Sequence, residues 1–199
     1  MMYPIRSLEM LSASRCLVHL EAGNSFPLYK KELALYEISE GAVLSSESYH
    51  EIMHVLLPKR ACHRAMHLLE KMDRTEYQIR KKLQDDGYPS EIVEYVVDYV
   101  KSFHYIDDIR YAWNYIDFRK NDQSKRQIMM ALQEKGISEG DIQAALNDTE
   151  FPDEIDQIRN WIEKKHYCQD RADIKEKQRM YQFLMRKGYN ASDIRKMIF

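Results

Sequence analysis

Lysine and arginine side chains grouped along predicted helices are the residues of this sequence best suited to chemistry. The groups are Arg80-Lys81-Lys82, Arg119-Lys120, Lys125-Arg126, Arg186-Lys187 and Arg195-Lys196. They recur at comparable positions of an internal repeat. Cations in such groups neutralise the phosphates of a nucleic acid backbone, whereas a single group of this kind is typical of a solvated helix face. The recurrence therefore favours a binding surface.

We predict one set of partner-binding residues from these groups and the basic positions around them. The set is Lys59, Arg60, Arg64, Arg74, Arg80, Lys81, Lys82, Arg119, Lys120, Lys125, Arg126, Lys135, Arg186, Lys187, Arg195 and Lys196. The whole chain carries 30 basic and 32 acidic residues and a net charge of −2. Because affinity for a nucleic acid backbone grows with the number of neutralised phosphates, this balance argues against a tight, autonomous DNA binder.

Catalytic motifs are missing from the sequence. It has no glycine-rich phosphate loop, no Gly-x-Ser-x-Gly nucleophile elbow and no Cys-x-x-Cys pair. Two histidine pairs, His50/His54 and His63/His67, have the i,i+4 spacing of metal ligands, but neither contains the glutamate of a His-Glu-x-x-His helix. We therefore expect polar imidazoles, no metal, no cofactor and no enzyme active site.

Aromatic residues at helical spacing are interpreted as packing residues rather than as a stacking platform for bases. They are Tyr95, Tyr99, Tyr111, Trp113 and Tyr115. The three cysteines are odd in number and far apart along the chain, which indicates reduced thiols in a cytoplasmic protein.

The elements that must position these residues are helices. The 199 residues include only six glycines and five prolines, and 44% of the residues are hydrophobic. Collagen-like, disordered and turn-dense β-sandwich chains need more of both glycine and proline. No stretch reaches the ~18 uncharged apolar residues of a membrane span, and Glu9 interrupts the apolar run that a signal peptide needs. We expect a mainly α-helical, cytoplasmic protein.

A threefold repeat organises the helices. The pattern apolar-x3-Gly-apolar-x4-apolar occurs around Gly87, Gly136 and Gly188. Glycine at this place ends a helix in the left-handed conformation. Ser138 and Asn190 are in register to cap the helices that follow. Self-similarity at a nearly fixed period predicts three tandem, helix-turn-helix-like units of three helices each, stacked in a curved, elongated array.

We place the domain boundaries at 1–57, 58–104, 105–150 and 151–199. The predicted repeat helices are 59–72, 74–86, 90–102, 107–119, 123–135, 138–147, 153–165, 172–187 and 191–198. Asp73-x-x-Glu76 is the predicted start of the second of these helices, and Ser48 with Glu51 is a predicted capping box further upstream. Pro58 is predicted to mark the junction between two helices.

The first 57 residues have a different pattern. Alternation over Arg15–Glu21, followed by a glycine-containing turn and Phe26–Tyr29, predicts a β-hairpin. A further strand is expected within Ile5–Leu11, and a short helix over Lys30–Tyr36. Because three short strands bury little apolar surface alone, this extension should dock on the first repeat.

Short motifs along residues 59–199 resemble one known family. In order they are Lys59-Arg60-Ala61, Arg64-Ala65, Leu68-Leu69, Asp73-Arg74-Thr75-Glu76, Ile79-Arg80-x-Lys82-Leu83, Gly87-Tyr88-Pro89, Tyr105-Ile106-Asp107-Asp108, Tyr111-Ala112, Lys135-Gly136-Ile137, Phe183-Leu184-x-x-Lys187-Gly188-Tyr189 and Asp193-Ile194-Arg195. Together they are similar to RecX, the regulatory protein of the bacterial recombinase RecA. The first 57 residues resemble the strand-containing extension of some members.

The resemblance implies a non-catalytic inhibitor of RecA. It implies a monomer whose helical array lies in the groove of the RecA–single-stranded DNA filament and lowers ATP turnover, filament extension and strand exchange. Two other interpretations stay open from the residues alone. One is a tandem helix-turn-helix protein that binds DNA directly, and the other is a helical scaffold for an unrelated partner.

Overall fold

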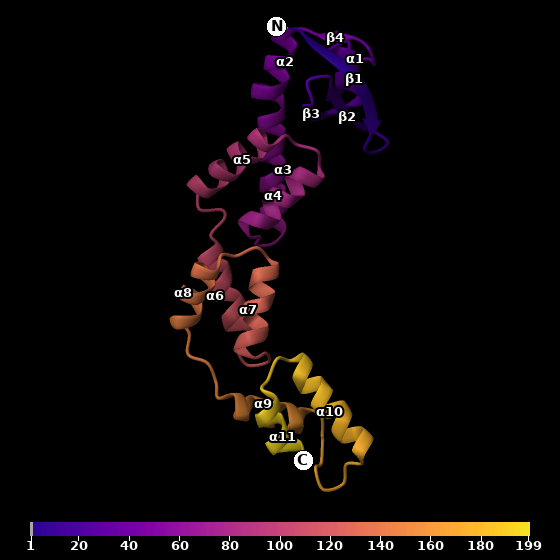
Figure 1. Cartoon of the computed structure of the whole chain (residues 1–199). Coiled ribbons are helices and arrows are strands. Elements are labelled where there is room, and N and C mark those ends of the chain that lie inside the picture. Colours follow the sequence, from indigo (N-terminus) through magenta and orange to yellow (C-terminus); the bar gives the residue numbers. More distant parts are fainter. Residues whose placement is uncertain (1) are drawn as a thin grey trace. The chain divides into compact units, whose positions relative to one another are not determined.

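The computed structural model describes residues 2–199 and is mainly helical, as predicted (Figure 1). The chain divides into two compact units, of which the first ends at Asp107 and the second begins at Asp108. The strands, all in the first unit, are β1 (Tyr3–Met10), β2 (Arg15–Leu20), β3 (Ser25–Tyr29) and β4 (Val43–Leu44). The helices of that unit are α1 (Lys30–Leu35), α2 (Ser46–Glu51), the π-helical turn η1 (Ile52–Leu56), α3 (Leu57–Lys71), α4 (Glu76–Asp85) and α5 (Ser90–Ser102). Those of the second unit are α6 (Asp108–Arg119), α7 (Lys125–Glu134), α8 (Glu139–Asn147), α9 (Glu154–Lys164), α10 (Ile174–Arg186) and α11 (Ala191–Ile198).

The four strands form one antiparallel sheet in the order β3-β2-β1-β4. The predicted hairpin is β2–β3, in which Val18 pairs with Phe26, and the predicted upstream strand is β1. The structure adds β4, which pairs with the start of β1. An alternating pattern needs several residues to be visible, so a strand of two residues has no sequence signal of its own.

The sheet and the first three repeat helices share one hydrophobic core. Val18, Leu20 and Phe26 of the sheet are buried together with Ala61 of α3 and Val97 of α5. The alternation in β2 therefore aims its apolar side chains at the helices, as period-2 geometry requires. This confirms that the strand-containing extension docks on the first repeat.

The junction at Pro58 differs from the prediction that one helix ends there. The backbone stays helical from α2 through η1 into α3, and Pro58 lies in the first turn of α3. In η1 the Leu57 N–H donates to the Ile52 carbonyl, one residue further back than in an α-helix. Because Pro58 has no N–H, the α-helical bonding pattern is interrupted, and the wider π turn continues the helix through the interruption.

Two predicted helix caps are also wrong by a few residues. The N-cap of α2 is Ser45, whose hydroxyl accepts a hydrogen bond from the Ser48 N–H, so Ser48 lies inside the helix. The N-cap of α4 is Thr75, which forms a capping box with Gln78 and replaces the predicted Asp73 start. In both places two residues able to cap a helix lie within three positions of each other, so the local sequence does not choose between them. Ser138 and Asn190 cap α8 and α11 as predicted.

The second unit contains two hydrophobic cores, one for each of its repeats. The first is built by α6, α7 and α8 around residues such as Ile116 and Leu132, and the second by α9, α10 and α11 around Ile158, Leu184 and Ile194. The separation of the cores matches the predicted repeat, since each group of three helices buries its own apolar faces.

The three repeat glycines adopt the conformation that the sequence predicts. Gly87, Gly136 and Gly188 have φ values of 88°, 80° and 85°, which only glycine adopts without strain. After each glycine the next N–H donates to a carbonyl of the preceding helix, and its side chain is buried: the residues are Tyr88, Ile137 and Tyr189. These three turns close the second helix of each repeat and fix the direction of the third.

Burial raises the pKa of both Tyr88 and Tyr189 to about 12, against an ordinary value of 10.0. Above pH 10 the phenols ionise in the unfolded chain but stay protonated in the folded one, so stability is lost as the pH rises from 10 to 12. A shift of two units corresponds to about 2–3 kcal/mol for each tyrosine. In an absorbance titration at 295 nm, we expect two of the 14 tyrosines to ionise last, together with unfolding. Tyr88→Phe should leave one late tyrosine; ionisation of all tyrosines near pH 10 in a folded protein would contradict this.

Candidate partner-binding surface

The second helix of each repeat turns one apolar stripe inward and leaves the opposite face in solvent. The buried pairs, each four residues apart, are Ile79/Leu83 in α4, Ile128/Leu132 in α7 and Met180/Leu184 in α10. The exposed predicted cations of these helices are Lys81, Lys82, Lys125, Arg126 and Arg186. Among residues 2–199 none of the five forms an ion pair. These five side chains therefore remain available to a partner.

In the first unit, three predicted arginines are engaged by acidic residues of the same unit. Arg60 forms an ion pair with Glu32 of α1 and lies over the Tyr29 ring, 4.7 Å from its centroid. Arg64 donates from Nε to an Asp86 carboxylate oxygen at 2.8 Å. The side chains of these two arginines and of the third, Arg80, are half-buried. Their ion pairs therefore stabilise the first unit.

Arg80 is the third of these arginines and the first residue of the densest basic group. Its Nε donates to Glu76 at 2.7 Å, and its terminal nitrogen pairs with Glu94 of α5. The pKa of Glu76 lies below its ordinary value, because hydrogen bonds from Lys101 and Arg80 outweigh the opposing effect of partial burial. Within Arg80-Lys81-Lys82, the two lysines are therefore exposed while the arginine ties α4 to α5.

The remaining predicted residues also divide into exposed cations and cations engaged by other groups of the chain. Lys59 and Arg195 are exposed, whereas Arg74 donates to the Leu68 carbonyl at 3.4 Å. Lys120 and Lys196 pair with the acids three residues before them, at 2.9 and 3.0 Å. Arg119, Lys135 and Lys187 lie against aromatic rings, and Lys187 is closest, with its Nζ 4.4 Å from the Trp161 centroid.

The basic groups do not occupy equivalent places in the three repeats, which corrects the expectation of comparable positions. Lys81 and Lys82 lie in the middle of α4. Lys125 and Arg126 form the first turn of α7, and Arg186 ends α10. Aligning the repeats on their glycines therefore places the charges on different turns. Each repeat exposes cations on its second helix, but the charge pattern itself is not repeated.

Three of the five aromatic residues differ from their packing interpretation, and two confirm it. Tyr95, Tyr99 and Trp113 are 54%, 41% and 43% exposed, while Tyr111 and Tyr115 are half-buried against the core of α6, α7 and α8. Helical spacing alone does not say which side of the helix meets the core when apolar residues occur on both sides. Val96, Val97 and Val100 fill the core side of α5 instead.

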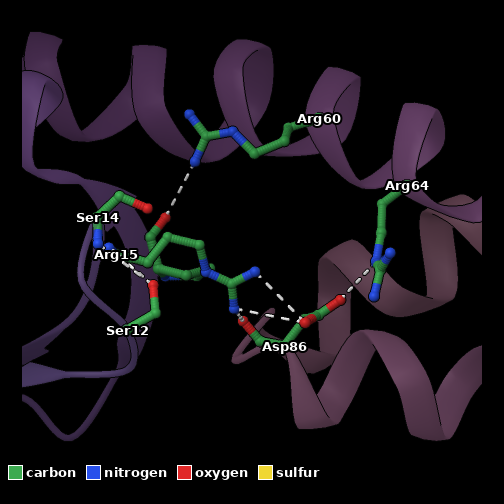
Figure 2. A network of polar contacts seen from close by, with 7 residues as sticks. Ser12, Ser14, Arg15, Arg60, Arg64 and Asp86 are labelled. Atoms are coloured by element: carbon green, nitrogen blue, oxygen red, sulfur yellow. Dashed lines mark hydrogen bonds and ion pairs between the residues drawn. The ribbon is translucent and has the colours of Figure 1, made fainter.

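Asp86 was not singled out by the sequence, yet it joins three elements (Figure 2). Arg15 of β2 donates to the Asp86 carbonyl at 2.8 Å and lies 3.4 Å from its carboxylate, and Arg64 of α3 approaches the other carboxylate oxygen. The contact links residues 71 positions apart. The local pattern Asp85-Asp86-Gly87 does not predict this contact.

The second unit has a comparable polar junction between its two repeats. Gln157 and Trp161 of α9 donate to the carbonyls of Lys120 and Asp122 at 2.8 and 3.2 Å. The Ser124 N–H donates to the Lys187 carbonyl at 3.2 Å. The loop before α7 is therefore held by α9 and by the glycine turn of the last repeat.

The described part of the chain has neither a cluster of metal ligands nor a helix that could cross a membrane. The ring centroids of the exposed imidazoles of His50 and His54 lie 4.4 Å apart. Within residues 2–199, however, no three histidine, cysteine or acidic side chains gather as metal ligands would. Each of the three cysteines is free. None of the helices in this range has the length and apolar character to span a membrane.

Known proteins similar to this chain share its three-helix repeats. Models of the first, second and third three-helix domains of RecX match residues 61–99, 107–146 and 152–198. Regulatory protein RecX of Clostridium tetani is 33% identical over 139 residues, which cover 67% of this chain and 63% of that protein. Regulatory protein RecX of Cronobacter sakazakii is 32% identical over 68% of this chain and 88% of that protein. A crystal structure of regulatory protein RecX aligns with a TM-score of 0.60 and 26% identity over 98% of both chains. The chain therefore belongs to the RecX family.

Proposed function

We propose that this chain is a non-catalytic regulator of the RecA recombinase that binds the RecA–single-stranded DNA filament. Bound along the filament groove as a monomer, it inhibits ATP hydrolysis, filament extension and strand exchange. The observation that carries the proposal is the run of three RecX-type units, each with exposed cations on its second helix. Contacts made by tandem units add along a repetitive target.

The composition of the surface favours a mixed target of protein and phosphate. Part of the predicted cationic set is neutralised within the chain, for example Arg64 by Asp86 and Arg80 by Glu76. Fewer free cations mean a weaker affinity for naked DNA. A filament offers protein groups beside the nucleic acid backbone, and scattered cations on successive units suit such a composite target.

The test is RecA ATPase and strand exchange on single-stranded DNA with the chain titrated in. Inhibition at less than one chain per recombinase protomer is the expected result. Absence of inhibition at that ratio would contradict the proposal. Binding to duplex DNA with a steep salt dependence and without a recombinase effect would instead support the tandem helix-turn-helix alternative.

A double charge reversal tests the exposed lysines of α4. Lys81→Glu with Lys82→Glu should raise the half-inhibitory concentration by about tenfold, because two charge-assisted contacts are lost and two repulsive ones are created. Arg80 stays unchanged, since it holds α4 to α5. The matched control is Lys30→Glu with Lys31→Glu, another exposed adjacent pair of the first unit, which lies outside the matched domain. Equal inhibition by the two double variants would remove Lys81 and Lys82 from the binding surface.

A further inference from the structure

The last repeat contains a pocket of about 560 Å³ between the loop that joins α9 to α10 and one face of α10. None of its lining residues belongs to the predicted partner-binding set. Tyr167, Met180 and Phe183 form its apolar wall, and Lys165, Arg171 and Arg179 bring cations to it. The pocket thus combines an aromatic wall with a positive rim.

The apolar wall is held in place by contacts behind it. Met180 is buried, and the half-buried Phe183 ring meets Trp161 edge-on, with the centroids 5.2 Å apart. The Tyr167 hydroxyl donates to the Ile198 carbonyl at 3.3 Å, and its backbone N–H donates to the Ile162 carbonyl at 3.0 Å. A flat ligand would therefore meet a preformed surface.

The rim carries more positive than negative charge. Arg171 and Arg179 are exposed and form no ion pair within residues 2–199, while the Lys165 Nζ lies 5.1 Å from the Phe183 centroid. The acid that lines the pocket is Glu176, whose carboxylate accepts a hydrogen bond from the Asp173 N–H in the capping box of α10. Three cations against one such acid leave an excess that an anionic ligand can neutralise.

We propose that this pocket binds one nucleotide unit. The base takes the place of the Lys165 ammonium over the Phe183 ring and stacks there beside Met180. The phosphate then lies between Arg171, Arg179 and the displaced Lys165. Stacking on an aromatic ring is tolerant of base identity, and guanidinium groups bind phosphate oxygens through paired hydrogen bonds. A free nucleotide and a nucleotide within a single strand share this chemistry. None of the residues that line the pocket is one of the exposed cations on which the RecA proposal rests, so the site is tested on the chain alone.

Cys168 supplies an internal probe, because its exposed thiol lines the pocket. Neutral iodoacetamide should alkylate Cys168 first, since Cys16 is buried and burial raises the pKa of the half-buried Cys62. Thymidine monophosphate or oligothymidylate should slow alkylation of Cys168 about tenfold when nine-tenths of the sites are occupied. The compound that protects Cys168 at the lower concentration identifies the ligand of the pocket, either a free nucleotide or a single strand. Absence of protection by both, or equal protection by inorganic phosphate, would overturn the nucleotide assignment.

Two variants of α10 separate the pocket from general charge effects. Arg179→Glu should raise the protecting concentration about tenfold, because it replaces a phosphate-binding cation with an anion. Lys175→Glu makes the same charge change on an exposed residue of the same helix that does not line the pocket, and protection should stay within about twofold of the unchanged chain. Unchanged urea denaturation followed by tryptophan fluorescence shows that both variants are folded, since Trp161 packs against Phe183 in the same repeat. If Cys168 were protected at the same nucleotide concentration in the Arg179→Glu and Lys175→Glu variants, the proposal would be overturned.

Discussion

Gly188→Ala is expected to destabilise the second unit by about 2–4 kcal/mol, as the sum of a backbone and a packing effect. Gly188 has a φ of +85°, which is strained for alanine. An added Cβ would also lie 2.3 Å from the Ser124 Oγ and 3.0 Å from the Gln127 Cβ. Ser124 is the N-cap of α7 and its Oγ accepts from the Gln127 N–H at 3.2 Å, so displacing that oxygen also weakens the cap.

The measurement is urea denaturation followed by tryptophan fluorescence. Both tryptophans of the chain, Trp113 and Trp161, belong to the second unit, so this signal reports on the unit that the substitution affects. Gly140→Ala is the matched control: Gly140 is helical, and the nearest atom to an added Cβ is 3.8 Å away. We expect this control to be stabilising by roughly 0.5–1 kcal/mol. Equal stability of the two variants would contradict the close packing of the Gly188 turn.

A second substitution at the junction separates the two causes. Ser124→Gly removes the oxygen that the methyl group introduced by Gly188→Ala would meet, and it costs only a few tenths of a kcal/mol as a change of N-cap. The double variant should therefore be less destabilised than the sum of the two single variants, by about 1 kcal/mol. Strict additivity would assign the effect of Gly188→Ala to backbone strain and the contact with Gln127, and would exclude the Ser124 hydroxyl as a cause.

The repeats could be predicted because their signals are local. An i,i+4 apolar pair such as Ile128 and Leu132, followed by a glycine and a capping residue, specifies a helix, its end and the start of the next helix within one stretch of chain. Cap positions failed only where several capping residues compete, as at Ser45 and Ser48. These signals depend on backbone geometry, so they hold in all three repeats.

The binding surface could be predicted only in part, because the pairing of charges is a tertiary property. Lys81 and Arg80 are neighbours of the same charge in the sequence, but only Arg80 meets acids of α4 and α5. Likewise Asp86 is one carboxylate of an ordinary helix end until β2 and α3 bring two arginines to it. Which cations remain for a partner follows from the packing of distant segments.

Asp86→Ala is expected to destabilise the first unit by about 2–3 kcal/mol. Removing one partner of a fully buried ion pair costs about 3–5 kcal/mol, and the value is lowered here because the side chains of Arg15, Arg64 and Asp86 keep 18–38% exposure. The substitution leaves two half-buried guanidinium groups without their carboxylate. Arg15 keeps its bond to the residue 86 carbonyl, which is a backbone atom.

Asp85→Ala is the matched control, since Asp85 is the exposed neighbour at the same helix end and forms no ion pair within residues 2–199. Its effect should stay within about 0.5 kcal/mol. The readouts are denaturation followed by circular dichroism and hydrogen exchange of peptides from β2. Loss of Asp86 should speed exchange in β2, because Arg15 fastens that strand to the end of α4, whereas Asp85→Ala should leave it unchanged. Equal exchange in the two variants would show that apolar packing of Val18 and Leu20 against the helices suffices to hold the sheet.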